Sequence, residues 1–499
     1  MEGAPRESSS TTRARLPVVV GVAQVEQRID DPSAAREPLA LMEDALRAAA
    51  EDAGGRELLS RADALYVIRG IWPYRNPAAV LAERLGNSAC TTFGTPFGGN
   101  VVQSSVHHAA LRIARGESEI ALLTGAETGR TQQRARKLGV SPTYTAAPGT
   151  YQQRVAEERR MNGPAELARG IAQPIQLYPI FESALRHRAG EPFAAHRMRI
   201  ARLWARFSEV AERNPAAWLR ERFSAEEICT PSERNRMVGF PYTKLMNAND
   251  AVDQGAALIL CSVEAAHRLA LARERWIFLH AGADGHDHFF VSERQDLCSS
   301  PAIRIAGARA LELAGRSLDE IAHLDLYSCF PSAVQVAMNE LGIDAERSPT
   351  VTGGLTFAGG PLNNYVMHAI ARMVQVLRED RGSFGLVTAN GGFLTKHSFG
   401  VYSAEEPRDG YRFANVQAEI DALPKRAVVV DARGRAQIEG YTVMFGAGGA
   451  SIAHAACLLA DGSRSWANSQ DRALLDAMTR EEHGGREVEL DGAGGLELA

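Results

Sequence analysis

The chain has 499 residues, of which 45% are hydrophobic and 23% charged, a composition typical of globular proteins with a substantial core. The net charge of -5 disfavours nucleic acid as a partner, because binding phosphate backbones needs a strongly basic surface. No stretch reaches the roughly 20 apolar residues of a membrane helix, and the six cysteines contain no C-x-x-C pair. We therefore expect a cytoplasmic protein with reduced thiols, without membrane contact and without structural zinc.

The chain opens with a predicted β-α-β unit. Residues 1–15 are polar and contain no apolar run, so they are predicted to form a disordered tail and not a secretory signal. The run PVVVGVAQV from Pro17 is typical of a strand buried on both faces. Apolar residues recur at helical spacing over 39–50, and ADALYVI then returns to strand character, which predicts an α/β fold.

Two distant segments repeat each other. FGGNVVQSSVHHA and FAGGPLNNYVMHA share glycines, a valine and a His-Ala pair in the same order. Val106 and His108 recur at Val366 and His368, and both differences are 260. The sequence thus predicts two duplicated α/β halves whose glycine turns lie near a shared centre. Such turns either pack tightly at a domain interface or offer backbone N–H groups to a ligand oxygen.

Composition divides the rest of the chain. The arginine-rich stretch 130–245 is predicted to be a helical insertion that serves as a lid, a packing layer or a dimer contact. After Ser403, short alternating strands with Gly-rich turns predict a small β-barrel. The predicted units are a first half over 16–275, a second half over 276–403 and a C-terminal β domain over 404–499.

Four segments carry a family resemblance that spans the body from Pro17 to Ser403. GFPYTKLMNANDAVDQGAALILCS, DLYSCFPSAVQ, VTGGLTFAGGPLNNYVMHA and GLVTANGGFLTKHSFGVYS resemble the thiolase superfamily, and within it the sterol-carrier-type thiolases and thiolase-like proteins type 1, often labelled acetyl-CoA acetyltransferases. The resemblance implies a thiolase fold with an added C-terminal domain of the oligonucleotide/oligosaccharide-binding (OB) type. It also implies a homodimer formed through the sheet edge of the first half.

The catalytic residues of thiolases are replaced in this sequence. Their nucleophilic cysteine, which lies at a helix start where its pKa is lowered, corresponds to a position near Gly99. Their G-H-P histidine corresponds to Gly360, and the cysteine of their C-x-G turn corresponds to Ala389 within Ala389-Asn390-Gly391. The third motif appears as Tyr327-Ser328-Cys329-Phe330. The ordinary Claisen mechanism is therefore not expected.

Polar residues remain at the positions where the family builds its pocket. Cys329 and Tyr327 could supply a thiol or a phenol, and His397 could act as a base if its pKa lies near neutrality. Asn390, Asn363 and Asn364 could donate hydrogen bonds to a carbonyl oxygen. His286 and His288 form an H-x-H pair without a recognisable third ligand, so no metal site is predicted. Further candidates for substrate binding are Gly99, Asn100, Gly359, Gly360, Gly391 and His288.

Three functions remain open. The first is binding of an acyl-CoA or other acyl thioester, followed by acyl transfer or carbon–carbon bond chemistry with an altered residue set and no tightly bound cofactor. The second is retro-aldol cleavage with Tyr327 and Tyr365, because a thiolase-fold relative paired with a similar β domain uses tyrosines. The third is a non-catalytic binding or scaffolding protein.

Overall fold

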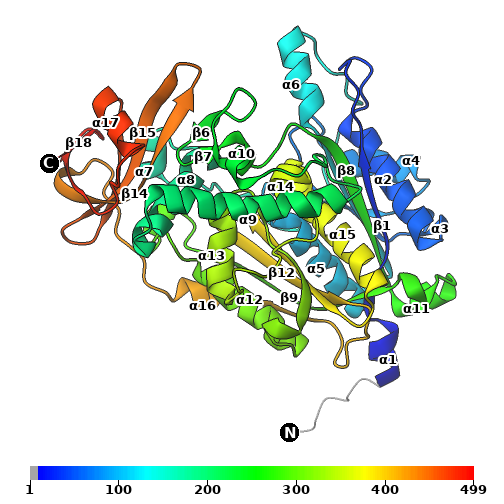
Figure 1. Cartoon of the computed structure of the whole chain (residues 1–499). Coiled ribbons are helices and arrows are strands. Elements are labelled where there is room, and N and C mark those ends of the chain that lie inside the picture. Colours follow the sequence, from blue (N-terminus) through cyan, green and yellow to red (C-terminus); the bar gives the residue numbers. More distant parts are fainter. Residues whose placement is uncertain (1–8, 499) are drawn as a thin grey trace, which may run out of the picture.

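The computed structural model describes residues 9–498, in which two α/β halves share one large sheet (Figure 1). The strand order of this eleven-stranded sheet is β10-β11-β12-β9-β1-β8-β4-β2-β3-β5, with β13 beside β9. The halves join where β1 pairs with β9 over two residue pairs, Val18 with Phe278 and Val19 with Ile277. The structure therefore has the duplicated α/β architecture predicted from the repeat.

The first half begins with a buried strand and a capped helix. β1 (Pro17–Glu26) is rich in β-branched residues, which favour a strand buried on both faces. α2 (Pro38–Ala53) starts on a proline and ends at Gly54, whose φ of 78° suits a left-handed C-cap. The remaining elements are α3 (Glu57–Ser60), β2 (Ala64–Val67), α4 (Pro77–Arg84), β3 (Thr91–Gly94), α5 (Val101–Ala114), β4 (Ile120–Thr128), β8 (Asp253–Ser262) and α11 (Val263–Arg268).

The second half repeats the pairing of the first. β2 is parallel to β4, which is antiparallel to β8, which is antiparallel to β1. In the second half β10, β11, β12 and β9 pair in the same sequence of directions. Its elements are η2 (Arg273–Arg275), β9 (Ile277–His286), η3 (Val291–Glu293), α12 (Pro301–Ala314), η4 (Leu318–Glu320), β10 (Ile321–Asp325), α13 (Pro331–Leu341), α14 (Gly354–Phe357), η5 (Leu362–Asn364), α15 (Tyr365–Glu379), β11 (Phe384–Gly391) and β12 (Lys396–Ser403).

The two helices that follow the repeated glycine turns lie at the centre of the molecule. α5 contacts β1, β4 and β8 of its own half and β11 and β12 of the other half, and it also contacts α15. α15 contacts β1 and β8 of the first half in turn, and Val106 and Val366 are both fully buried. The helix starts of both halves, with their free N–H groups, are thus brought together.

The segment 130–245 lies over the body and also reaches the C-terminal sheet. α9, the long green helix of Figure 1, contacts α13 and α14 of the second half. Glu182 is buried and accepts hydrogen bonds from Tyr242 Oη at 2.5 Å and Gln335 Nε2 at 2.8 Å, which ties this segment to α13. Its elements are α6 (Gly129–Leu138), β5 (Gln153–Arg154), α7 (Pro164–Ala168), α8 (Pro174–Ala189), α9 (Phe193–Arg213), α10 (Ala225–Cys229), β6 (Met237–Gly239), β7 (Tyr242–Thr243) and η1 (Lys244–Met246).

The sheet edge that the resemblance assigns to a dimer contact is covered by the chain itself. β5 pairs with β3 through Phe93 and Gly94, and Val155 N donates to Gly94 O at 3.0 Å. The Gln152 side chain adds a bond from Thr92 N of 2.8 Å. Pairing of β3 with a second copy would therefore require β5 to be displaced.

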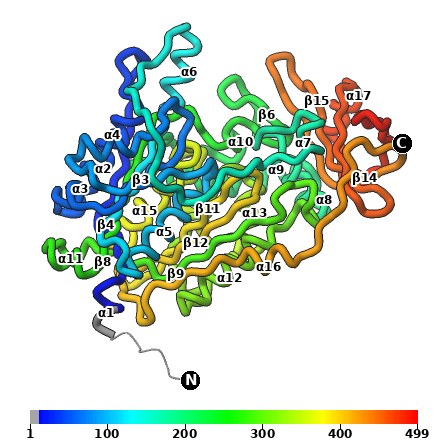
Figure 2. Tube along the Cα trace, turned by 180° about the vertical axis from the view of Figure 1, so that it is seen from behind, coloured from blue at the N-terminus to red at the C-terminus, as the bar shows by residue number. Residues whose placement is uncertain are grey.

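The C-terminal domain starts later than the predicted residue 404. β13 (Arg412–Asn415) pairs parallel to β9 and belongs to the large sheet, so the boundary lies beyond α16 (Gln417–Asp421). Figure 2 shows this connection running along the body before it enters the second sheet. That sheet has the order β16-β15-β14-β17-β18, with β6 beside β14. Its elements are β14 (Arg433–Gly446), β15 (Gly449–Leu459), β16 (Arg464–Ser469), α17 (Arg472–Met478), β17 (Glu487–Asp491) and β18 (Leu496–Leu498).

The N-terminal prediction needs a correction as well. Within the predicted disordered tail, residues 9–14 form the short helix α1 (Ser9–Ala14), while residues 1–8 lie outside the described part of the chain. Arg13 forms an ion pair with Glu406 at 2.7 Å, which holds this helix against the connection to the C-terminal domain.

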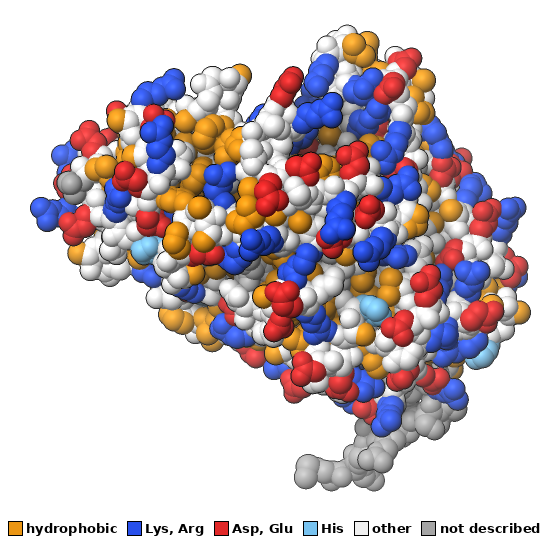
Figure 3. Space-filling view, viewed as in Figure 1, with side chains coloured by type: hydrophobic (Ala, Val, Ile, Leu, Met, Phe, Trp, Pro, Cys, Tyr) orange, Lys and Arg blue, Asp and Glu red, His pale blue; other side chains and the backbone are white. Residues whose placement is uncertain are grey.

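On the face shown in Figure 3, basic and acidic side chains are interspersed over the region that α9 crosses. Among residues 9–498, no helix is both long enough and apolar enough to span a bilayer.

Candidate functional site

The glycine turns of the two halves meet, as the repeat predicts. Gly98 N donates to Asn363 Oδ1 at 3.0 Å, which joins the turn before α5 to the turn before α15. The turn between β11 and β12 closes on the same place, because a Cβ on Gly391 would lie 2.4 Å from Asn100 Oδ1 and 3.2 Å from Gly99 N. Gly99, Asn100, Asn363 and Gly391 therefore form one site.

No side chain fits at residue 99. A Cβ on Gly99 would lie 2.3 Å from the hydroxyl oxygen of Tyr327 and 2.4 Å from the backbone oxygen of Asn390. Real Cβ atoms do not approach this closely, and the Asn390 oxygen is backbone that cannot rotate away. The position that the resemblance assigns to the nucleophilic cysteine is thus sterically sealed by Tyr327.

The two candidate tyrosines are neighbours with different environments. The rings of Tyr327 and Tyr365 meet edge to face, with centroids 5.6 Å apart. Tyr365 Oη lies 2.9 Å from Asp325 Oδ1, to which it donates, and 2.7 Å from Thr352 Oγ1. Burial raises the pKa of Tyr365 well above its ordinary value, and the Asp325 charge adds to this shift. The pKa of Tyr327 is also raised by burial, so both phenols stay protonated.

Cys329 and Asn390 lie close together, and contacts within the protein fix their side chains. Asn390 Nδ2 donates to Tyr178 Oη at 2.9 Å and lies 3.9 Å from Cys329 Sγ. Tyr178 stacks on Phe330 with centroids 4.4 Å apart, which fixes this arrangement. Burial raises the pKa of the Cys329 thiol to about 12, so it remains an unreactive thiol at neutral pH.

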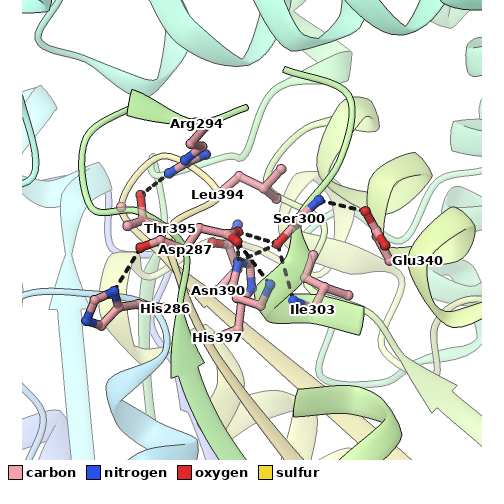
Figure 4. Close-up of polar contacts among 12 residues, drawn as sticks. His286, Asp287, Arg294, Ser300, Ile303, Glu340, Asn390, Leu394, Thr395 and His397 are labelled. Atoms are coloured by element: carbon pink, nitrogen blue, oxygen red, sulfur yellow. Dashed lines mark hydrogen bonds and ion pairs between the residues drawn. The ribbon is translucent and has the colours of Figure 1, made fainter. Parts of the chain in front are cut away.

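His397 does not meet the condition for a base. It is buried on β12 directly opposite Asn390, and its Nε2 lies 3.4 Å from Ser300 Oγ and 3.8 Å from Asp287 Oδ2 (Figure 4). Burial lowers the pKa of His397 to about 3. The imidazole is therefore neutral and weakly basic near pH 7, and its contacts hold the start of α12 against β12.

The amides of Asn363 and Asn364, which were predicted to contact a carbonyl oxygen of a ligand, donate instead to backbone oxygens of the protein. Asn363 Nδ2 donates to Arg69 O at 2.7 Å, and Asn364 Nδ2 donates to Gly125 O at 2.8 Å. These bonds link the second half to the first and engage one donor of each amide. Gly360 N likewise donates to Asn249 O at 2.9 Å, and a Cβ on Gly359 would lie 2.2 Å from Gln254 Oε1. Both glycines serve close packing.

The two histidines of the H-x-H pair diverge. His288 is buried, and its Nε2 lies 3.1 Å from Pro424 O, so it contacts the connection to the C-terminal domain and not an acyl pocket. His286 is half-buried and lines a cavity of about 440 Å³. The prediction that His288 binds substrate finds no support in this geometry.

A small cavity lies at the candidate centre, and a larger one lies beside it. Tyr327, Asn390 and His397 line a cavity of only about 10 Å³, roughly the space of one water molecule. The larger cavity is bounded by the start of α5, by residues 155–159 and by the ends of β9 and β12. Lys396 lines it, and the Lys396 amine donates to Phe97 O at 2.6 Å. Burial lowers the pKa of Lys396 to about 8.

A second large cavity, of about 540 Å³, is cationic. It is lined by Arg69, Arg75 and Arg154 together with Trp72 and Tyr151. Sequence reasoning missed both this cavity and Lys396, because their residues are scattered along the chain. One feature of the sequence could have drawn attention to Lys396, because lysine is rare in this chain. Of its 55 basic residues only four are lysines, namely Lys137, Lys244, Lys396 and Lys425.

Comparison with known proteins adds a family context. A family profile described as the thiolase-like protein type 1 additional C-terminal domain matches residues 415–494. The crystal structure of a monomeric SCP2-thiolase like protein type 1 from Mycobacterium smegmatis is 32% identical, with a TM-score of 0.83, over 97% of this chain and 99% of that one.

More distant solved structures share the fold alone. The Ltp2-ChsH2(DUF35) aldolase is 19% identical with a TM-score of 0.61, and the match covers 79% of this chain and 100% of that one. Human mitochondrial 3-ketoacyl-CoA thiolase is 15% identical with a TM-score of 0.56, over 79% of this chain and 100% of that one.

Proposed function

Because this chain belongs to the family of SCP2-thiolase-like proteins type 1, we propose that it binds an acyl thioester of an anionic carrier of the coenzyme A type. Any acyl-transfer or carbon–carbon bond chemistry then proceeds without the cysteine and histidine of thiolases. The sealed position at Gly99 supports this second part, since it leaves no room for a covalent thiol intermediate there.

The arginine-lined cavity is the observation that carries the proposal. Arg69 pairs with Glu158 at 2.6 Å, whereas Arg75 and Arg154 have no carboxylate partner among residues 9–498. Unpaired guanidinium groups in a concave site favour phosphate, to which they donate two hydrogen bonds at once. Trp72 and Tyr151 supply aromatic surface for a ring system in the same cavity.

The two large cavities border the same loop. Thr95 and Phe97 line the arginine cavity, whereas Pro96 and Asn100 line the Lys396 cavity. This arrangement suits a ligand that has an anionic part and a carbonyl-bearing part, which is the chemistry of an acyl thioester on a phosphorylated carrier.

Calorimetric titration with coenzyme A, acetyl-CoA and longer acyl-CoAs tests the proposal. We expect binding that the double variant Arg75→Ala, Arg154→Ala weakens at least about tenfold, because two phosphate contacts are lost. Arg435→Ala is the matched control, since Arg435 is exposed on β14 and forms no ion pair within the described chain. Absence of binding to every thioester would exclude the proposal.

Retro-aldol cleavage is a second candidate because Tyr327 and Tyr365 lie in contact beside the closed centre. The raised phenol pKa values allow these groups to donate a hydrogen bond but oppose a role as a base. Assaying cleavage of a β-hydroxyacyl thioester by the double variant Tyr327→Phe, Tyr365→Phe decides the point, and unchanged cleavage would eliminate tyrosine catalysis.

The closed centre also supports a third candidate, a binding protein without catalysis. A screen in which the protein binds thioesters but converts none of them would favour it over both enzymatic functions.

A further inference from the structure

The amine of Lys396 lies beside the loop where the family resemblance places a nucleophile. Lys396 begins β12 and is half-buried at the wall of the 440 Å³ cavity. A Cβ on Gly98 would lie 2.6 Å from Lys396 Nζ, so the amine rests against the turn that precedes α5. It is thus placed between the closed thiolase-like centre and the open cavity.

The Lys396 amine is not neutralised by an ion pair. Within the described chain no carboxylate lies within 4.0 Å of it, and the hydrogen-bond partner found is Phe97 O. Burial lowers its pKa more than the charge of Glu158 raises it. The other charged or titratable groups that line its cavity are His107, His108, Glu157, Arg159, Asp284 and His286, besides the neutral His397. At pH 7 roughly a tenth of this amine is uncharged and nucleophilic.

His286 is the cross-strand partner of Lys396. The two residues are paired directly between antiparallel β9 and β12, so their side chains project from the same face of the sheet. His286 Nδ1 lies 2.8 Å from the backbone oxygen of Asp287, to which it donates, so the neutral ring carries its lone pair on Nε2 (Figure 4). Burial lowers the pKa of His286, so the ring is neutral near pH 7 and its Nε2 is a proton acceptor of reduced basicity.

A third polar group lines the same cavity without a partner. Asn100 Oδ1 is buried and has no hydrogen-bond partner among residues 9–498. The choice of residue type at 396 is informative too, because Lys396 is one of four lysines among 55 basic residues. Arginine cannot lose its proton in proteins, whereas lysine can, so a lysine suits a site that needs a free amine.

We propose that Lys396 is a nucleophile that condenses reversibly with the carbonyl group of a small aldehyde or ketone in this cavity. The nitrogen lone pair attacks the carbonyl carbon, and His286 transfers one amine proton to the carbonyl oxygen to give a carbinolamine. His286 then accepts the second amine proton and delivers it to the hydroxyl group, so water leaves and an imine forms. This reaction goes beyond thioester binding and does not depend on the arginine cavity.

Reductive trapping tests the inference on the full-length chain. The protein is incubated with acetaldehyde, acetone or pyruvate and with sodium cyanoborohydride, whose hydride reduces an imine to a stable secondary amine, and each lysine is then quantified by peptide mass spectrometry. A pKa near 8 makes the free-amine fraction at pH 7.5 roughly two-hundredfold larger than for an ordinary lysine. We expect Lys396 to be labelled at least about tenfold faster than Lys137, Lys244 or Lys425 with at least one of these compounds.

Variants and pH separate this reaction from surface labelling. Lys396→Arg should abolish the selective adduct, whereas Lys425→Arg, a change at an exposed lysine, should leave it intact. The rate for Lys396 should rise with pH and level off above about 8, and His286→Gln should slow it several-fold at pH 7. Equal labelling of all four lysines in the unmodified chain would overturn the inference, even if a variant fails to fold. Because no thioester is present, this result is independent of the calorimetric test.

Discussion

Tyr327 occupies the space that any side chain at residue 99 would need, since its hydroxyl oxygen lies 2.3 Å from where a Cβ on Gly99 would be placed. The glycine at the position that the resemblance assigns to the nucleophile is therefore sterically coupled to Tyr327. A cysteine cannot be placed at residue 99 unless both Tyr327 and the Asn390 backbone move, and Tyr327 is held by the bond of 2.9 Å from its backbone N–H to Thr388 Oγ1.

Replacing Gly99 by alanine should destabilise the fold. The added methyl group meets backbone at Asn390, so we expect the free energy of unfolding to fall by about 1–3 kcal/mol, as for overpacked cores. Gly382→Ala is the matched control, because Gly382 is exposed and has no atom within 4 Å of its Cβ position. Urea unfolding measures the free energy of unfolding of both variants. Equal effects of the two changes would show that residue 99 is not constrained as described.

Replacing Glu127 by glutamine should change the pH dependence of stability. Glu127 is buried on β4 and accepts a bond from Ile71 N at 2.9 Å, and burial raises its pKa from 4.5 to about 8. The folded state thus holds this proton more tightly than the unfolded state, so the contribution of Glu127 to stability is full below pH 4.5 and is lost as pH rises toward 8. The loss is on the order of a few kcal/mol.

Glu127→Gln removes this loss while keeping an acceptor for Ile71 N. We expect the variant to melt at a higher temperature than the parent at pH 8.5, with a smaller difference at pH 5.5. Glu83→Gln, a change at an exposed residue of α4, should show no such trend. Thermal melts across this pH range measure the difference in melting temperature between the variant and the parent. A difference that does not change with pH would contradict the raised pKa of Glu127.

Arg464 should control how firmly the C-terminal domain is docked. Its guanidinium is fully buried, pairs with both oxygens of Glu439 at 2.7 and 2.8 Å, and donates to backbone oxygens including Ser292 O at 2.8 Å. Arg464→Met leaves the Glu439 charge without its partner, so we expect a loss of about 3–5 kcal/mol.

Limited trypsin digestion of the connection over 404–431 detects this loss. Cleavage there should accelerate at least about tenfold in Arg464→Met, because the connection opens when the domain undocks. Arg435→Met, at an exposed arginine of β14, should be cleaved like the parent. Similar rates for both variants would show that docking does not depend on Arg464.

Tyr365→Phe should cost stability whether or not the chain is an enzyme. The change removes the bond of 2.9 Å to Asp325, a fully buried carboxylate, so we expect a loss of about 1–3 kcal/mol in chemical unfolding. Tyr144→Phe is the control, since the Tyr144 hydroxyl has no hydrogen-bond partner among the described residues and its ring, which packs against Tyr74 and the core of the first half, is kept in phenylalanine. A loss no larger than that of the control would mean that Tyr365 is not needed for structure, and a catalytic role would then gain support.

Much of the architecture was predictable because it depends on local patterns. Buried strands, helix caps and the 260-residue repeat follow from periodicity, and they led to two halves whose glycine turns meet, as the bond from Gly98 to Asn363 confirms. The boundary at residue 404 was wrong because the polar break EEPRDG lies before β13, and local composition does not say which sheet a strand joins.

The replacement of the thiolase residues was also readable along the chain, since it concerns residue identity at motif positions such as Gly99 and Gly360. What those replacements do to the site was not. Whether Asn390 and His397 are free to react depends on burial and on hydrogen-bond partners from other elements, such as Tyr178 and Ser300. The pKa of Lys396 and its access to a cavity depend on the same three-dimensional surroundings, because desolvation arises only when distant segments pack together.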